Sequence, residues 1–145
     1  MTSVNDSMNG DGGANGEPDG PGSWTTTSIV APDGASGYHL SNLDIETMFF
    51  HARNAYLLGL DVDDLWHQPV VPQIKELATR FDAEINSGAA LDSRTRIVSR
   101  SRRAFVMEQE LVDAPSGSVA ATCRSVHVTV DATGAVEIPD WLWDA

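Results

Sequence analysis

The chain has 145 residues, 41% of them hydrophobic, and a formal net charge of -12 at pH 7. This length and composition suit one compact domain with an apolar core. The negative charge argues against nucleic acid or an anionic membrane as a partner. A single cysteine, Cys123, excludes an internal disulfide and a multi-cysteine zinc site, and its alternating neighbours favour a buried structural thiol.

The first 23 residues are rich in Gly, Asn, Asp and Pro and hold few large apolar side chains. We therefore expect a disordered acidic tail, followed by one domain at residues 24–145. The tail lacks the basic start and the apolar run of a signal peptide, and nowhere do about 18 apolar residues stand together. These features predict a cytoplasmic protein that does not insert into a membrane.

The first regular element expected is a strand at residues 24–32, where β-branched residues stop at a proline. A Gly-rich loop follows, and Asn42 is the predicted cap of a helix that ends at Gly59. Apolar residues recur at helical spacing through this segment and predict a broad buried face. They include Ile45, Met48, Phe49, Ala52, Ala55, Tyr56 and Leu58.

Four more strands are expected, at about residues 73–85, 91–100, 103–113 and 119–130. The segments "NSGAA", "APSGS" and "DATG", which follow the first, third and fourth of them, are rich in turn-forming residues. The order predicts an α+β fold, in which a curved antiparallel five-stranded sheet is wrapped round one long central helix. Because such a sheet has open edges, we expect it to pair with a second copy of the chain.

Four segments carry a resemblance to a known family: "DGASGYHLSN", "NAYLLGLD", "SRSRRAFVMEQELVD" and "VHVTVDATGAVEIPDWL". With the order of elements, they resemble the hotdog-fold acyl-CoA thioesterases of the 4-hydroxybenzoyl-CoA thioesterase family over roughly residues 25–143. The resemblance implies a hotdog fold, a homodimer or homotetramer, and no cofactor. It also implies hydrolysis of an acyl-CoA, or of an acyl-phosphopantetheine thioester on an acyl carrier protein.

In that family an Asp in the loop before the helix acts as nucleophile or general base, and Asp33, nine residues before Asn42, matches its position. Asn42 would fix the helix start, and backbone N–H groups of the Tyr38 to Asn42 stretch would stabilise the oxyanion. The family usually has a Gly three residues after the Asp, whereas Gly37 comes four residues after Asp33. Some hotdog thioesterases work without this carboxylate, through polar donors and water. The loop residues implied to contact substrate are Gly37, Tyr38 and Leu40.

Two further residues near the helix start have alternative interpretations. His39 is a candidate base, or a histidine that only shapes the loop. Glu46 lies one turn inside the helix, and other hotdog branches use a helical glutamate as their catalytic carboxylate. Alternatively, Glu46 is a first-turn acid that interacts favourably with the helix dipole.

Residues 94–103 carry five of the nine basic residues and no acid, in an otherwise acidic chain. One interpretation places these arginines on the solvated face of a strand pair. The resemblance favours another, in which Arg100, Arg102 and Arg103 bind the CoA phosphates, often from the partner subunit. The planar guanidinium can donate two hydrogen bonds to one phosphate.

Other chemistries find less support. No histidines stand at the i, i+4 spacing of a helical metal site, and "GASG" lacks the spacing of a nucleophile elbow. A non-catalytic binder of acyl-CoA or acylated carrier protein is the main alternative to a thioesterase. A 3-hydroxyacyl-thioester dehydratase is a weaker one, because it needs an acid facing a histidine such as His39.

Overall fold

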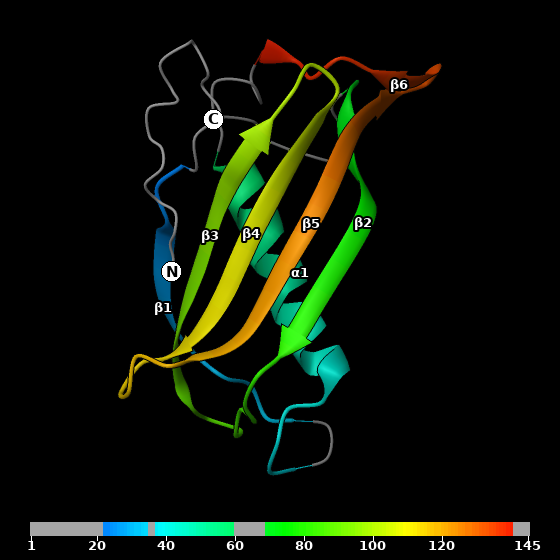
Figure 1. Cartoon of the computed structure of the whole chain (residues 1–145). Coiled ribbons are helices and arrows are strands. Elements are labelled where there is room, and N and C mark those ends of the chain that lie inside the picture. Colours follow the sequence, from blue (N-terminus) through cyan, green and yellow to red (C-terminus); the bar gives the residue numbers. More distant parts are fainter. Residues whose placement is uncertain (1–21, 35–36, 60–68, 141–145) are drawn as a thin grey trace.

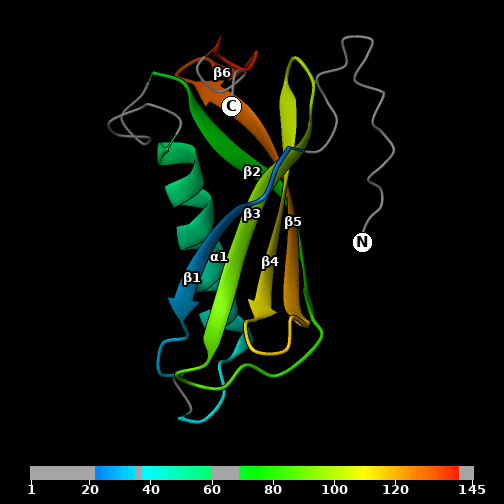
Figure 2. The same cartoon turned by 90° about the vertical axis from the view of Figure 1, so that its left-hand side faces the viewer.

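The structure is a computed structural model that describes residues 22–34, 37–59 and 69–140. The elements in chain order are β1 (Thr25–Val30), α1 (Asn42–Leu58), β2 (Val71–Phe81), β3 (Ala90–Arg100), β4 (Ala104–Asp113), β5 (Val119–Asp131) and β6 (Gly134–Val136). The sheet is antiparallel in the order β1-β3-β4-β5-β2, and β6 pairs with β5. Helix α1 lies along one face of this curved sheet (Figures 1 and 2). The predicted α+β hotdog fold is confirmed, with one short additional strand, β6.

The helix begins one residue earlier than predicted, because Ser41 and not Asn42 is its N-cap. The Ser41 hydroxyl accepts from the Asp44 N–H at 3.1 Å, and the Asp44 carboxylate accepts from the Ser41 N–H at 2.8 Å. This reciprocal pair is a capping box, which satisfies two N–H groups at the helix start. The predicted stop at Gly59 is confirmed, since its N–H donates to the carbonyl of Ala55.

The core lies between α1 and the inner face of the sheet. Ile45 and Phe49 of the helix are buried against alternate residues of the central strands, such as Leu91 and Leu111. Because side chains alternate along a strand, only every second residue of β4 faces α1. The inner face also buries polar side chains, which the apolar pattern did not predict. They are Arg53, Ser93, Thr95, Gln109, Ser125, His127 and Thr129.

The strand predicted at residues 73–85 begins at Val71 and ends at Phe81. Beyond it, the N–H groups of Asp82 and Ala83 both donate to Ala120, and the chain leaves the sheet. Residues 85–87 then bond to the loop that precedes α1, through Leu40 N–H to Ile85 O and Ser87 N–H to Tyr38 O, each at 2.8 Å. The turn between β2 and β3 is thereby tied to the predicted active loop.

The predicted tail at residues 1–23 lies outside the described residues except for Gly22 and Ser23. The Gly22 N–H donates to the carbonyl of Ile97 at 2.8 Å, so the chain is already attached to β3 there. Across the described ranges, none of the helices has the length and apolar character needed to cross a bilayer.

Candidate functional site at the start of the helix

The loop that carries Asp33 packs against the segment leading into α1. A Cβ placed on Gly34 would lie 2.2 Å from the carbonyl oxygen of His39 and 3.3 Å from the Cα of Leu40. Only glycine permits this approach, so Gly34 brings its neighbour Asp33 alongside the two residues that precede the N-cap. Asp33 itself is exposed to solvent. Asp33 is therefore a solvent-exposed neighbour of the contact that Gly34 makes with the segment leading into α1.

Ser87, from the turn between β2 and β3, holds both sides of this loop. Its hydroxyl accepts from the Gly34 N–H at 2.8 Å and donates to the Gly37 carbonyl at 2.7 Å. Gly37 has a φ of 103°, a conformation that favours glycine. The sequence interpretation missed Ser87, although it recognised the segment "NSGAA" as a turn.

The prediction that N–H groups from Tyr38 to Asn42 serve as oxyanion donors does not hold for two of these residues. The N–H of Leu40 already donates to Ile85, and that of Ser41 to the Asp44 carboxylate. The first N–H groups of an α-helix have no intrahelical acceptor, and they carry the positive end of its dipole. Asn42 and Leu43, which are both exposed, supply the donors at this helix start.

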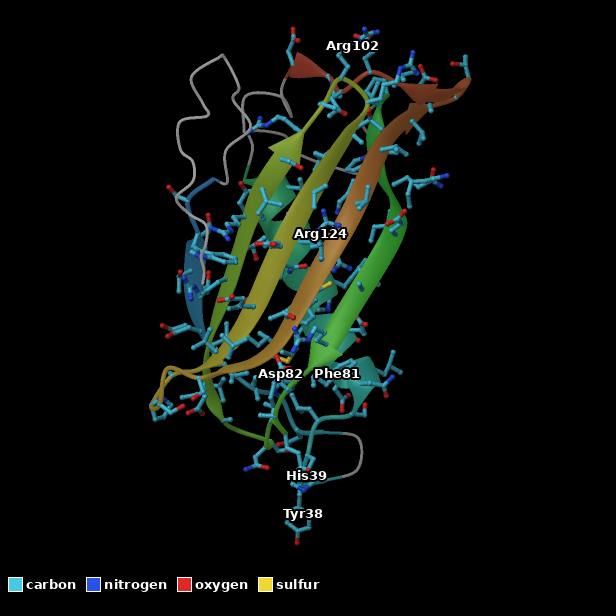
Figure 3. The ribbon with its side chains drawn as sticks, viewed as in Figure 1. Tyr38, His39, Phe81, Asp82, Arg102 and Arg124 are labelled. Carbon is cyan, nitrogen blue, oxygen red and sulfur yellow. The ribbon has the colours of Figure 1, made fainter. Side chains whose placement is uncertain are left out.

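His39 lies at the tip of the loop, at one end of the molecule (Figure 3). Its Nδ1 is 2.9 Å from Asn86 Oδ1 and 3.7 Å from Glu84 Oε1, and its side chain is half exposed. An Nδ1–H donated to Asn86 would leave Nε2 as a hydrogen-bond acceptor. Tyr38 is 82% exposed, whereas Leu40 is buried in the core and offers no surface to a substrate.

Glu46 differs from an ordinary first-turn acid. It is half buried, and its Oε1 is buried with no hydrogen-bond partner among the described residues. Glu46 also contributes to raising the pKa of Cys123, after the larger effect of burial, so its charge is felt inside the core. The predicted buried thiol at Cys123 is confirmed.

The arginine-rich segment divides into two groups. Arg94 and Arg96 lie on the outer face of β3, each 3.0 Å from a glutamate of β4, and both guanidinium groups lie over the ring of Trp24. This is the solvated strand-pair interpretation, and it applies to these two residues. Ion pairing and stacking on Trp24 account for both side chains on this face of the sheet.

The second group surrounds the turn between β3 and β4. Arg102 forms an ion pair with Glu137 at 2.8 Å, and Arg103 is exposed. Arg100 lies near Tyr56, where burial raises the pKa of the phenol and the arginine charge partly offsets that effect. Arg102 and His39 are at opposite ends of the molecule (Figure 3). The predicted phosphate-binding residues therefore do not meet the Asp33 loop within one protomer.

Two hollows flank α1. The larger, of about 440 Å³, lies between α1 and strands β1 and β3, and its lining includes Ile29, Met48 and Ala52. The smaller, of about 270 Å³, lies between α1 and strands β2 and β5. Its lining includes two buried polar residues, Arg53 and His127. Neither hollow was predicted, because each depends on which faces of the helix and sheet are apposed.

Among residues 22–34, 37–59 and 69–140, no three His, Cys, Asp or Glu side chains are grouped so as to hold a metal ion. The groups present near the helix start are the Asp33 carboxylate, the His39 imidazole and the N–H groups of the first helical turn. Such donors stabilise negative charge that develops on a carbonyl oxygen.

Comparison with solved structures identifies proteins of the same fold. A 1,4-dihydroxy-2-naphthoyl-CoA thioesterase from Synechocystis has 16% identity and a TM-score of 0.74, covering 83% of this chain and 93% of its own. A DHNA-CoA thioesterase from Staphylococcus aureus has 18% identity and a TM-score of 0.71, covering 83% and 87%. A further Staphylococcus aureus protein, solved in complex with CoA, has 11% identity and a TM-score of 0.76, covering 84% and 80%.

The comparison with curated proteins gave no match. The model of the Thioesterase-like superfamily matches residues 34–145, which is most of the chain. The match is at the level of this superfamily, and the narrower 4-hydroxybenzoyl-CoA thioesterase family stays a prediction. The chain belongs to the Thioesterase-like superfamily.

Proposed function

We propose that the protein hydrolyses the thioester of an acyl-CoA. The observation that carries this proposal is the close approach of Gly34, the neighbour of Asp33, to His39 and Leu40, the two residues that precede the N-cap of α1. Membership of the superfamily supports it, as do relatives of the same fold that are named acyl-CoA thioesterases. An acyl-phosphopantetheine on a carrier protein presents the same thioester and is a second possible substrate.

In the proposed reaction the thioester carbonyl oxygen accepts hydrogen bonds from the N–H groups of Asn42 and Leu43. Asp33 removes a proton from an attacking water, or it attacks the carbonyl carbon itself to form a mixed anhydride that water then hydrolyses to the free acid. The C–S bond then breaks, and the thiolate of CoA leaves and takes up a proton. The helix dipole stabilises the oxyanion that forms between these steps. In this proposal His39, whose Nδ1 lies 2.9 Å from Asn86 Oδ1, would serve as a second proton-transfer group.

A second copy of the chain would complete the site. β2 is the last strand in the sheet order, and its side chains Ile74, Leu77 and Phe81 are 39%, 45% and 47% exposed. A long exposed edge with apolar residues favours pairing with another strand. Antiparallel pairing of β2 with its own copy reverses one protomer relative to the other. The arginine turn of one protomer then lies at the same end as the partner's helix start.

The proposed assembly is thus a homodimer at least, in which Arg100, Arg102 and Arg103 bind CoA phosphates beside the partner's Asp33 loop. Mixing two inactive homodimers tests it. Asp33→Asn and Arg103→Ala protomers should together regain activity, because each mixed dimer has one site with neither substitution. Light scattering that shows only monomers, or mixing without recovery, would contradict the assembly.

The activity itself is tested by thiol release from aromatic and aliphatic acyl-CoAs. We expect turnover by the wild type and a loss of about 100-fold or more in Asp33→Asn. Asp92→Asn is the matched control, since Asp92 lies on β3 and accepts from the Ser28 hydroxyl at 3.3 Å, away from the loop. Full turnover by Asp33→Asn would show that the carboxylate is not needed and that water and the N–H donors at the helix start suffice for catalysis. Binding of acyl-CoA without turnover would favour a non-catalytic binder.

A further inference from the structure

The guanidinium of Arg53 is a buried positive charge that forms no ion pair with a carboxylate of the described residues, although the charge of the half-buried Glu46 also acts on Cys123, which Arg53 contacts. Arg53 is 5% exposed, and its Nη1 donates to Gln109 Oε1 at 3.0 Å and to Cys123 Sγ at 3.6 Å. Gln109 is itself fixed, since its Nε2 donates to the Phe49 carbonyl at 2.9 Å. Within the described part of the chain, no carboxylate forms an ion pair with Arg53. A buried charge lowers stability unless a partner offsets it.

This charge lines the hollow of about 270 Å³ between α1 and strands β2 and β5. The other lining residues are Phe50, Asn54, Leu57, Pro72, Gln73, Ile74 and His127. They combine apolar walls with amide groups, and none is a carboxylate. Burial, and then the charge of Arg53, lower the pKa of His127 to about 4, so this imidazole is neutral at pH 7. Arg53 is therefore the only charged group that lines the hollow among the described residues.

His127 is held rigidly beside the arginine. Its ring stacks on Phe105 with centroids 4.6 Å apart, and its Nε2 is 2.9 Å from the Ser125 hydroxyl. A neutral, fixed imidazole supplies one donor and one acceptor without a competing charge. The floor of the hollow thus favours an anionic oxygen, and its walls favour a hydrocarbon chain.

We infer that this hollow receives the end of an acyl group that carries an anionic oxygen, a carboxylate or a phenolate, and that Arg53 binds that oxygen. The inference rests on the proposed thioesterase function. At about 270 Å³ the hollow is the smaller of the two that flank α1. We therefore expect a short or aromatic acyl group in it.

The position of the hollow agrees with a site shared between two protomers. His127 pairs with Phe105 and with Ile74, and Phe105 pairs with Arg100, so the hollow is at the arginine end of the sheet. In the proposed dimer this end lies beside the partner's Asp33 loop. One protomer would then bind both the phosphates and the acyl end, and the other would supply the carboxylate.

The larger hollow on the β1 side offers a contrast. Its walls are mainly apolar and hydroxyl-bearing, and among the described residues that line it His51 and Tyr56 are the titratable side chains. An acyl group bound there would be uncharged. A preference for neutral acyl chains would therefore contradict the inference.

The test compares kcat/KM for matched thioesters in the full-length protein. Glutaryl-CoA and pentanoyl-CoA have equal chain length, and only the first ends in a carboxylate. We expect the wild type to prefer glutaryl-CoA, and Arg53→Met to lower that preference by roughly 10- to 100-fold. Arg53→Lys should keep part of it. Arg96→Met is the matched control, because it removes an outer-face arginine and should leave the ratio unchanged.

The ratio of kcat/KM for glutaryl-CoA to kcat/KM for pentanoyl-CoA separates recognition of the carboxylate from folding. A damaged fold would lower both values together and leave their ratio unchanged. A 4-hydroxybenzoyl-CoA and 4-methylbenzoyl-CoA pair tests the phenolate in the same way. Equal rates within both pairs for the wild type, or an unchanged ratio in Arg53→Met, would overturn the inference while leaving thioesterase function intact. If Arg53→Met does not fold, Arg53→Lys takes its place, and a glutaryl-CoA preference equal to that of the wild type would then overturn the inference.

A second readout does not need catalysis. Calorimetry with free glutarate should show saturable binding to the wild type and to Arg96→Met, and weaker binding to the Arg53 variants. Glutarate binding in a protein that hydrolyses no thioester would refute the proposed function and support the inference. Glutarate that binds neither wild type nor variant, together with equal hydrolysis of both thioesters, would refute the inference alone.

Discussion

Replacing Gly34 by alanine should disable the site while leaving the fold in place. The new Cβ would lie 2.2 Å from the His39 carbonyl oxygen and 2.9 Å from its carbon. Both are backbone atoms, so no side chain can rotate to relieve the overlap. To reach an ordinary contact of at least about 3 Å, the loop that carries Asp33 and Gly34 and the segment leading into α1 must separate by about 1 Å.

A displacement of about 1 Å at a reacting group can lower the rate by about 100-fold, and we expect a loss of that size in kcat/KM for acyl-CoA hydrolysis. The loop lies at the surface and can relax, so the stability cost should be about 1 kcal/mol, or a fall in Tm of about 3–6 °C. Thiol release and a thermal melt measure the two effects on one preparation.

Gly59→Ala is the matched control. Gly59 has a φ of -69°, and a Cβ there would meet no atom closer than 3.3 Å. Its activity should stay at the wild-type level, with Tm unchanged or slightly higher. A Gly34→Ala protein that retains more than about a third of wild-type kcat/KM would refute the idea that this close approach positions Asp33.

Three further outcomes follow from the same contacts. Ser87→Ala removes both hydrogen bonds to the loop and should lower kcat/KM by about 10-fold with a small change in Tm, and Ser87→Thr should restore much of it. Equal activity of wild type and Ser87→Ala would contradict a positioning role. Burial lowers the pKa of His127 from 6.5 to about 4, so between these pH values the unfolded chain binds a proton that the folded chain does not. The free energy of unfolding should therefore fall as the pH drops, and at pH 4.5 it should be about 2 to 3 kcal/mol lower than at pH 7. Urea unfolding at pH 7 and pH 4.5 should show a smaller loss in His127→Phe, and parallel pH dependences would count against the buried neutral imidazole. Ser41→Ala should cost about 1 kcal/mol through loss of the capping box, measured by the same unfolding assay; an unchanged midpoint would mean that water replaces the cap.

The regular elements were largely predictable because their signals are local. The alternation in "FVMEQELV" and "VHVTV" matches the burial pattern of β4 and β5, since a strand exposes successive side chains on opposite faces. The helix period and the stop at Gly59 were likewise readable. β6 was missed, because three residues are too few to show a period. The cap was misplaced by one residue, since Ser41 and Asn42 are both good caps and only the Asp44 geometry decides between them.

The candidate site depended on contacts between distant residues. Its carboxylate and loop were found from a resemblance, but Ser87 is 50 residues away from Gly37 and has no marker in the sequence. The arginines also looked alike in the sequence. Their roles diverged because strand register pairs Arg94 and Arg96 with glutamates and leaves Arg100 to Arg103 at the turn.

By itself, the sequence determined an α+β chain with one amphipathic helix, strongly alternating strands and a buried thiol, because each of these follows from the spacing of neighbouring residues. The tertiary structure alone decided that Arg53 is buried with no ion pair to a described carboxylate. It also decided that the loop with His39 and the turn with Arg102 lie at opposite ends of the molecule. The physical reason is that burial and charge pairing depend on which faces are apposed across the fold. A linear pattern specifies the faces of each element, and packing selects their partners.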